Sequence, residues 1–186
     1  MKRILLLALT FTVSATSYAN DNQQRVDQSK AVVKEFMTEL KGELEKAMKE
    51  GGPVNAIGVC NLKAPEIATR ISEKHQWDVA RTSLKLRNTE NKPDAWEEAV
   101  LNKFEARKAA GEAVEPMAYF EVVEENNKKY FRFMKAIPTG EVCLKCHGSN
   151  IDPKVVSKLD ALYPSDKARG YSVGDIRGAF TIKQPM

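Results

Sequence analysis

The stretch MAYFEVVEENNKKYFRFMKAIPTGEVCLKCH, residues 117–147, carries the strongest evidence for the fold. Residues 117–124 and 129–137 are rich in aromatic and β-branched side chains, and Glu125-Asn126-Asn127 between them is typical of a turn. The pattern therefore predicts a β-hairpin. Because its second strand leads through Pro138-Thr139-Gly140 to two cysteines, we expect the hairpin to position a cysteine-containing loop.

That loop contains Cys143-Leu144-Lys145-Cys146-His147, the Cys-x-x-Cys-His attachment motif of a c-type haem. Two thiols at this spacing can each add to one vinyl group of the same porphyrin, and the adjacent histidine can bind the iron. The motif predicts one covalent haem c on Cys143 and Cys146, with His147 as an axial ligand. A zinc site would need a second ligand pair, whereas the chain has 3 Cys and 2 His. A plain disulfide or redox dithiol remains the alternative, although the Pro-Thr-Gly turn before the motif differs from a thioredoxin β-α-β unit.

The N-terminus is consistent with export, which haem attachment to this motif requires. Lys2 and Arg3 precede a short apolar run at residues 4–13, and Ser17-Tyr18-Ala19 has the pattern of a signal-peptide cleavage site. We therefore predict a signal peptide at residues 1–19 and a single domain at residues 20–186. The apolar run is too short to span a membrane comfortably. The mature protein is expected in the periplasm, without a membrane span.

Composition limits the classes of partner. The chain has 186 residues with 42% hydrophobic and 29% charged side chains, as in an ordinary globular domain. The formal net charge is +4, and removal of Lys2 and Arg3 leaves +2. This charge is too small to indicate nucleic-acid binding. The lysines alternate with acidic residues along helical segments, which is typical of solvated faces.

If Cys143 and Cys146 are thioethers, Cys60 is the odd cysteine of an exported chain. Its setting, Ala56-Ile57-Gly58-Val59-Cys60, is small and apolar, which favours a buried core cysteine. The alternative is that Cys60 is the second axial haem ligand, where a thiolate would lower the reduction potential. Three further candidates for that position are His75, Met117 and Met134.

The remaining chain alternates helical and extended patterns. Apolar residues at helical spacing predict an amphipathic helix over residues 24–49, which Gly51-Gly52 and Pro53 should end. Shorter helices are expected at residues 54–62, 65–74, 94–110 and 153–162, an extended segment at 78–86 and a last strand at 178–183. This order indicates an α+β fold with helices packed on an antiparallel sheet. It differs from small all-helical cytochromes, whose haem motif lies near the N-terminus.

Several further stretches, in order, resemble a known family. They are residues 56–60 with Ala64-Pro65, 81–88 (RTSLKLRN) with 91–94 (NKPD), 143–148, 163–171 (YPSDKARGY) and 174–179 (GDIRGA). The chain resembles extracytoplasmic c-type haem proteins with a PAS-like fold, catalogued as a domain of unknown function. That domain occurs alone or as the sensory part of membrane histidine kinases. The resemblance implies a PAS-like haem domain in its free-standing form, and it favours Cys60 as the second axial ligand because a family member has a cysteine ligand at this place.

Four other polar residues are candidates for contact with the haem. Arg81 and Arg87 are suited to bind haem propionates, because a guanidinium pairs with a carboxylate in bidentate fashion. The alternative is that both arginines form ordinary surface ion pairs. Tyr163 and Arg177 are weaker candidates for the haem edge, in a segment whose glycines are more typical of turns.

Three functions follow from a haem with both axial positions filled. The first is a redox or small-gas sensor, in which a gas displaces Cys60 from reduced iron and a signalling partner relays the change. The second is an electron carrier with a redox partner protein. A haem enzyme such as a peroxidase is the least favoured, because it needs an open iron site and a distal acid-base pair, and His75 is poorly placed for that role.

Overall fold

The structure, a computed structural model, describes residues 14–186. The helices are α1 Ser14–Gly58, α2 Ala64–His75, α3 Ala95–Ala109, α4 Leu144–His147 and α5 Pro153–Leu162. The strands are β1 Asp78–Thr82, β2 Ala118–Glu125, β3 Lys128–Pro138 and β4 Ile176–Pro185. Residues 59–63 form a π-helical turn, and residues 89–91 and 141–143 form 3₁₀ turns. No helix within residues 14–186 is long and apolar enough to cross a membrane.

The signal-peptide prediction falls mainly on residues that the structure does not describe. Lys2, Arg3 and the apolar run at residues 4–13 lie outside the described residues. Helix α1 passes continuously through Ala19 and Asn20. Cleavage after Ala19 therefore stays a prediction.

The four strands form one antiparallel sheet in the order β1-β4-β3-β2. The predicted hairpin is confirmed as β2 and β3, with Glu125 paired to Lys128. Its turn is therefore the two residues Asn126 and Asn127, with φ of 53° and 60°. Asparagine tolerates this left-handed region better than most residues, which explains the Asn-Asn pair at this position.

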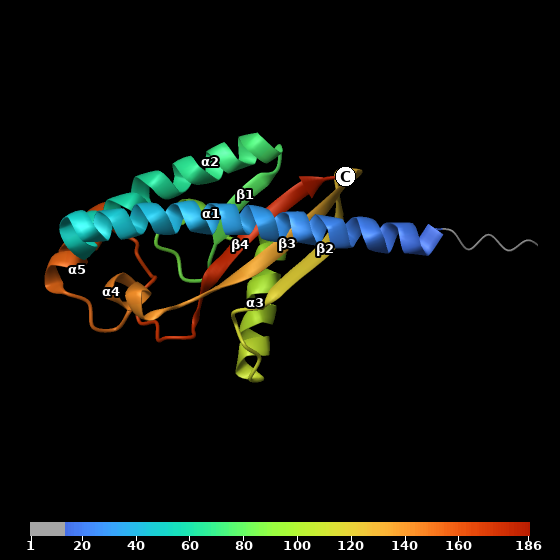
Figure 1. Ribbon diagram of the computed structural model, residues 1–186. Helices are drawn as coiled ribbons and strands as arrows, with labels where there is room; N and C mark the ends of the chain where they lie inside the picture. Colours follow the sequence, from blue (N-terminus) through green and yellow to red (C-terminus); the bar gives the residue numbers. More distant parts are fainter. Residues whose placement is uncertain (1–13) are drawn as a thin grey trace, which may run out of the picture.

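Helices cover both faces of the sheet (Figure 1). On one face α1 and α2 pack against alternate residues of β3, Phe131 and Phe133. On the other face α3 packs against the intervening residues, Met134 and Ala136. This alternation follows from the two-residue period of a strand. The predicted α+β class with a long N-terminal helix is confirmed, while the narrower PAS-like description stays a prediction.

Helix α1 is interrupted where the sequence predicted its end. Gly51 and Gly52 have non-helical backbone angles, with φ of 68° at Gly52, and Pro53 follows. The chain then resumes a helical path to Gly58 and passes into the π-helical turn Val59–Lys63. The π-helical turn carries Cys60 and continues directly into α2. Such turns are rare and often occur at functional sites.

Strand β1 is shorter than predicted, because the extended segment expected at residues 78–86 leaves the sheet after Thr82. The Ser83 hydroxyl accepts a hydrogen bond from the Lys85 backbone N–H and lies 2.9 Å from the Arg177 carbonyl, to which it donates. These bonds replace the ladder to β4. The neighbouring Gly178 allows this close approach, since a Cβ there would lie 2.3 Å from the Thr82 carbonyl oxygen.

Candidate functional site

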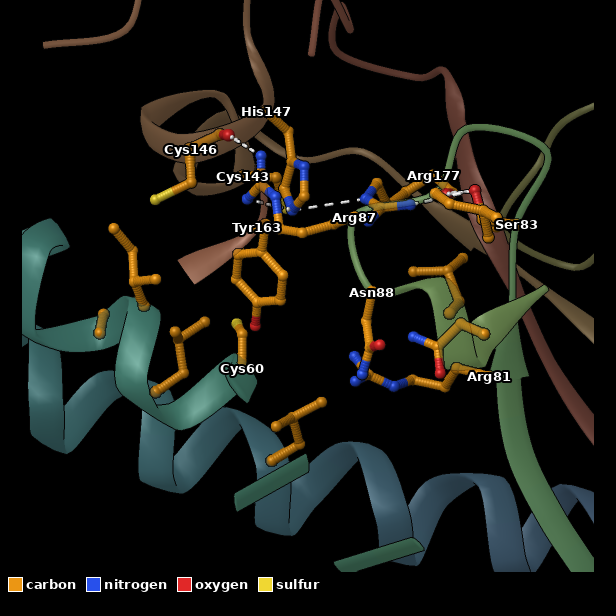
Figure 2. A pocket seen from close by; sticks show the side chains of 18 of the residues that line it. Cys60, Arg81, Ser83, Arg87, Asn88, Cys143, Cys146, His147, Tyr163 and Arg177 are labelled. Carbon is orange, nitrogen blue, oxygen red and sulfur yellow. Dashed lines mark hydrogen bonds between the residues drawn. The ribbon is translucent and has the colours of Figure 1, made fainter. Parts of the chain in front are cut away.

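A large cavity lies where the C-terminal part of α1, the π-helical turn, the segment after β1 and the Cys-x-x-Cys-His loop meet (Figure 2). Its empty volume is about 1220 Å³ when the space at its open mouth is included. Leu40, Leu44 and Met48, spaced one helical turn apart on α1, form an apolar wall. The cavity therefore suits a large and mostly apolar ligand.

The predicted attachment residues Cys143, Cys146 and His147 all line this cavity. They lie on the 3₁₀ turn at residues 141–143 and the single-turn helix α4. All three cysteines of the chain fall within the described residues, and none forms a disulfide. A backbone hydrogen bond joins the loop to the segment before β4: the Tyr171 N–H donates to the His147 carbonyl oxygen at 2.9 Å.

His147 has a defined orientation and protonation state. Its Nδ1 lies 2.7 Å from the Ala168 carbonyl oxygen. Because a carbonyl only accepts, Nδ1 carries the proton and Nε2 keeps its lone pair. Burial, with the nearby cations Arg177 and Arg87, lowers the pKa of His147 to about 3. The neutral imidazole therefore presents Nε2 to the cavity, as metal ligation requires.

Arg87 joins the loop to the segment at residues 166–168 through several hydrogen bonds. Its guanidinium binds both carboxylate oxygens of Asp166 at 3.2 and 3.1 Å and donates to the Cys146 carbonyl at 2.6 Å. It also donates to the Ala168 carbonyl, the same group that orients His147. The side chains of Arg87 and Asp166 are only 7% and 1% exposed. The alternative of a surface ion pair is therefore wrong for Arg87, which is a buried anchor of the motif.

Arg81 and Arg177 also line the cavity, but neither is paired with a carboxylate in the part of the chain that the structure describes. The Arg81 guanidinium lies 5.6 Å from the centre of the Phe36 ring. Arg177 donates from Nη1 to the Ser83 hydroxyl at 3.1 Å and from Nε to His147 Nε2 at 3.3 Å. Burial lowers the pKa of both arginines. An ordinary surface ion pair is therefore wrong for Arg81 as well.

Cys60 lies on the opposite wall of the cavity from His147, on the π-helical turn (Figure 2). It is half-buried and lines the cavity, so it is not a fully buried core cysteine. Tyr163, from the end of α5, lines the same cavity and lies near Cys60 in the view of Figure 2. Burial raises the pKa of the Tyr163 phenol.

The other candidate axial ligands lie elsewhere. His75 is 3.2 Å from a carboxylate oxygen of Glu35 and packs beside Trp77. Met117 and Met134 are fully buried in the core between the sheet and α3. None of the three lines the cavity, and Cys60 is the candidate that does.

Sequence analysis did not assign roles to Asp166 or to the apolar wall of α1. Asp166 belongs to the stretch at residues 163–171 that carries the family resemblance, but no local pattern indicated its pairing with Arg87. Leu40 and Leu44 fall on the apolar face of the amphipathic helix predicted at residues 24–49. Their spacing indicated a covered face correctly, but it did not indicate that a cavity adjoins part of that face.

The fold and the site define a class of protein, an α+β domain with a Cys-x-x-Cys-His loop in the wall of a large cavity. The sequence profile of the Tll0287-like family matches residues 11–185, and the chain therefore belongs to this family. A solved structure described as the cyanobacterial heme-protein Tll0287 shares the fold, with a TM-score of 0.66 at 21% identity. The match covers 88% of this chain and 96% of that chain. No curated protein sequence gives a significant match. The resemblance recognised from the sequence motifs is confirmed.

Proposed function

We propose that this protein is an exported mono-haem c-type cytochrome with a redox role. The observation that carries the proposal is the joint placement of Cys143, Cys146 and His147 in the wall of one large cavity. Family membership supports it, since a protein of the same fold is described as a heme-protein. The predicted signal peptide supports a periplasmic location.

The residues of the cavity fit a porphyrin. The thiols of Cys143 and Cys146 are unpaired and available to add S–H across two vinyl groups, which forms C–S bonds without loss of any group. His147 contributes a neutral ring whose Nε2 faces the cavity, where it accepts a hydrogen bond from Arg177 that an iron ion would replace. The apolar wall from α1 excludes water. Bound haem supplies one-electron chemistry at iron, which the protein itself lacks.

Cys60 is the proposed second axial ligand. Its support is its place on the opposite wall from His147 and the distance of the three alternative ligands from the cavity. A thiolate ligand favours ferric over ferrous iron and lowers the reduction potential. The proposed role is redox or small-gas sensing, in which Cys60 is the exchangeable ligand and a signalling partner receives the change.

Electron transfer is the second candidate function, and one observation favours it. Val142, directly before the first attachment cysteine, is 54% exposed and lines the cavity, so the attachment edge lies near the surface. A redox partner protein would need this kind of access. A peroxidase-like activity has no comparable support, because His75 is paired with Glu35 away from the cavity.

The proposal is tested on the exported, purified protein. Haem absorbance should stay with the chain after denaturation of the unaltered protein, whereas denaturation of the Cys143→Ser/Cys146→Ser variant should release all of its haem. Retention in that variant contradicts covalent attachment at these residues. Cys60→Ser should keep covalent haem but change the ferric absorption and EPR spectra, whereas an unchanged spectrum contradicts Cys60 ligation.

Carbon monoxide then separates the two roles. Binding after reduction, without binding to the oxidised protein, supports an exchangeable sixth ligand and hence sensing. No binding in either state favours electron transfer. Met134→Leu is a suitable control, since Met134 was a ligand candidate but is buried in the core on the α3 side of the sheet.

A further inference from the structure

The charged side chains that line the cavity all carry a positive charge. Four cationic side chains, Arg81, Arg87, Lys145 and Arg177, are in contact with it. No aspartate or glutamate among residues 14–186 lines it. Guanidinium groups removed from water are costly unless they are paired. A cavity of this kind therefore suits a ligand that brings its own negative charge.

The four cations differ in what already neutralises them. Arg87 is paired with the carboxylate of Asp166, and Lys145 is exposed to solvent. Arg81 and Arg177 are the two that have no carboxylate partner within the described residues, although both line the cavity. The cavity wall thus holds two uncompensated guanidiniums.

We propose that Arg81 and Arg177 together form a binding site for two carboxylates, the two propionate groups of the haem. This inference rests on the proposed function, and it replaces the expectation that Arg87 contacts a propionate. Two carboxylates match two unpaired guanidiniums in number and charge. A guanidinium is also the side chain that pairs with a carboxylate through two parallel hydrogen bonds.

The fold positions both side chains for this task. Arg81 is on β1 and Arg177 at the start of the adjacent strand β4, in an antiparallel pair that brings Thr82 opposite Ala179. The Arg81 guanidinium lies over the ring of Phe36, and the Ser83 hydroxyl accepts a hydrogen bond from Nη1 of Arg177. In Figure 2 Arg81 lies on the side of the cavity away from Cys146, whereas Arg177 lies beside His147, to which it donates. The porphyrin carries its vinyl and propionate groups on different edges, which agrees with the separation of Arg81 from Cys146.

The experiment compares haem with its dimethyl ester, in which both carboxylates are masked. The full chain carrying Cys143→Ser and Cys146→Ser binds either compound without a covalent bond, through His147. We measure both dissociation constants by titration of the haem absorbance. The protein should bind haem more tightly than the ester, by roughly tenfold to a hundredfold for each pair of charged hydrogen-bonding groups.

Substitutions then assign the preference to residues. Arg81→Gln and Arg177→Gln should each lower the haem-to-ester preference by roughly tenfold or more, while the affinity for the ester changes little. Lys145→Gln removes the same charge from the cavity wall and should leave the preference unchanged. A ratio is an internal measurement on one variant, so a moderate loss of stability does not affect it.

The outcomes separate this inference from the proposed function. Binding of neither compound contradicts haem binding itself. Equal binding of both compounds leaves haem binding intact but overturns the carboxylate site, as does an unchanged preference in the two Arg→Gln variants. If those variants fail to fold, the Arg81→Lys variant provides the test. A lysine keeps the charge but cannot form two parallel hydrogen bonds with a carboxylate. A haem-to-ester preference between that of the unaltered protein and no preference supports the inference, and a preference equal to that of the unaltered protein refutes it.

Discussion

Replacement of Asp166 by Asn should destabilise the protein strongly, because Asp166 lies at the centre of the network that holds the haem loop. Its carboxylate accepts two hydrogen bonds from Arg87, one from Arg169 at 2.9 Å and one from the Ala168 N–H at 2.9 Å. Asparagine keeps the shape but removes the charge and one acceptor. Breaking one partner of a buried ion pair costs about 3–5 kcal/mol.

Urea unfolding followed by circular dichroism measures this loss. With a slope of about 2 kcal/mol/M, a loss of about 3–5 kcal/mol lowers the midpoint by about 1.5–2.5 M. Asp160→Asn is the matched control, since Asp160 is 60% exposed and Arg169 is its one ion-pair partner among residues 14–186. The Asp160→Asn variant should lose less than about 1 kcal/mol of unfolding free energy. Equal midpoints for the two variants would refute the argument that the Arg87 and Asp166 pair anchors the loop.

The same substitution has a defined dependence on pH. Burial works to raise the pKa of Asp166, but hydrogen bonds from Arg87 and Arg169 outweigh it and hold the pKa below its usual range. A carboxyl whose folded pKa is lowered stabilises the protein above its unfolded pKa of about 3.9, and that stabilisation is lost as the pH falls through the folded value. The difference in free energy of unfolding between the Asp166→Asn variant and the unaltered protein should therefore have its full size at pH 7 and become smaller below about pH 4.

Two further substitutions test how local geometry supports the site. Gly178→Ala should lower stability by about 1–3 kcal/mol in thermal unfolding, because φ is 155° and the new Cβ would meet the Thr82 carbonyl. Gly58→Ala, at a helical position with open space, should instead stabilise by about 0.5–1 kcal/mol, and a loss there would contradict the comparison. Asp94→Ala removes the capping box of α3 and a carboxylate 2.7 Å from Arg132, and should cost at least about 1 kcal/mol in urea unfolding. A smaller loss would show that the cap contributes little.

Local sequence signals predicted the elements that depend on local chemistry. The Asn-Asn turn predicted the β2-β3 hairpin, and Gly51-Gly52 predicted the interruption of α1. The Cys-x-x-Cys-His motif identified the loop that lines the cavity. In each case residues within a few positions of one another determine the backbone, so the pattern is readable without the tertiary structure.

Long-range contacts were outside the reach of such patterns. Arg87 pairs with Asp166 across 79 positions, and nothing near either residue indicates the other. The early end of β1 depends on Ser83 meeting the Arg177 carbonyl, 94 positions away. The alternating pattern over residues 78–86 predicted a strand over its whole length. Such a pattern contains no information on a side-chain hydrogen bond that competes with strand pairing, as the Ser83 hydroxyl does here. The difference between Arg81 and Arg87 likewise appears only when their partners are known.

The connection between Cys60 and α1 leads to a last prediction, which distinguishes the two proposed roles. Leu40 and Leu44 line the cavity from the uninterrupted part of α1, whereas Cys60 follows the break at Gly51-Gly52 on a separate helical segment. If Cys60 leaves the iron on reduction, we expect residues 53–63 to exchange amide hydrogens faster in the reduced protein, while β3 stays unchanged. Hydrogen exchange followed by mass spectrometry measures both segments in one sample. Equal exchange in the two redox states would contradict ligand release and leave electron transfer as the function, because a carrier needs a site that changes little between oxidation states.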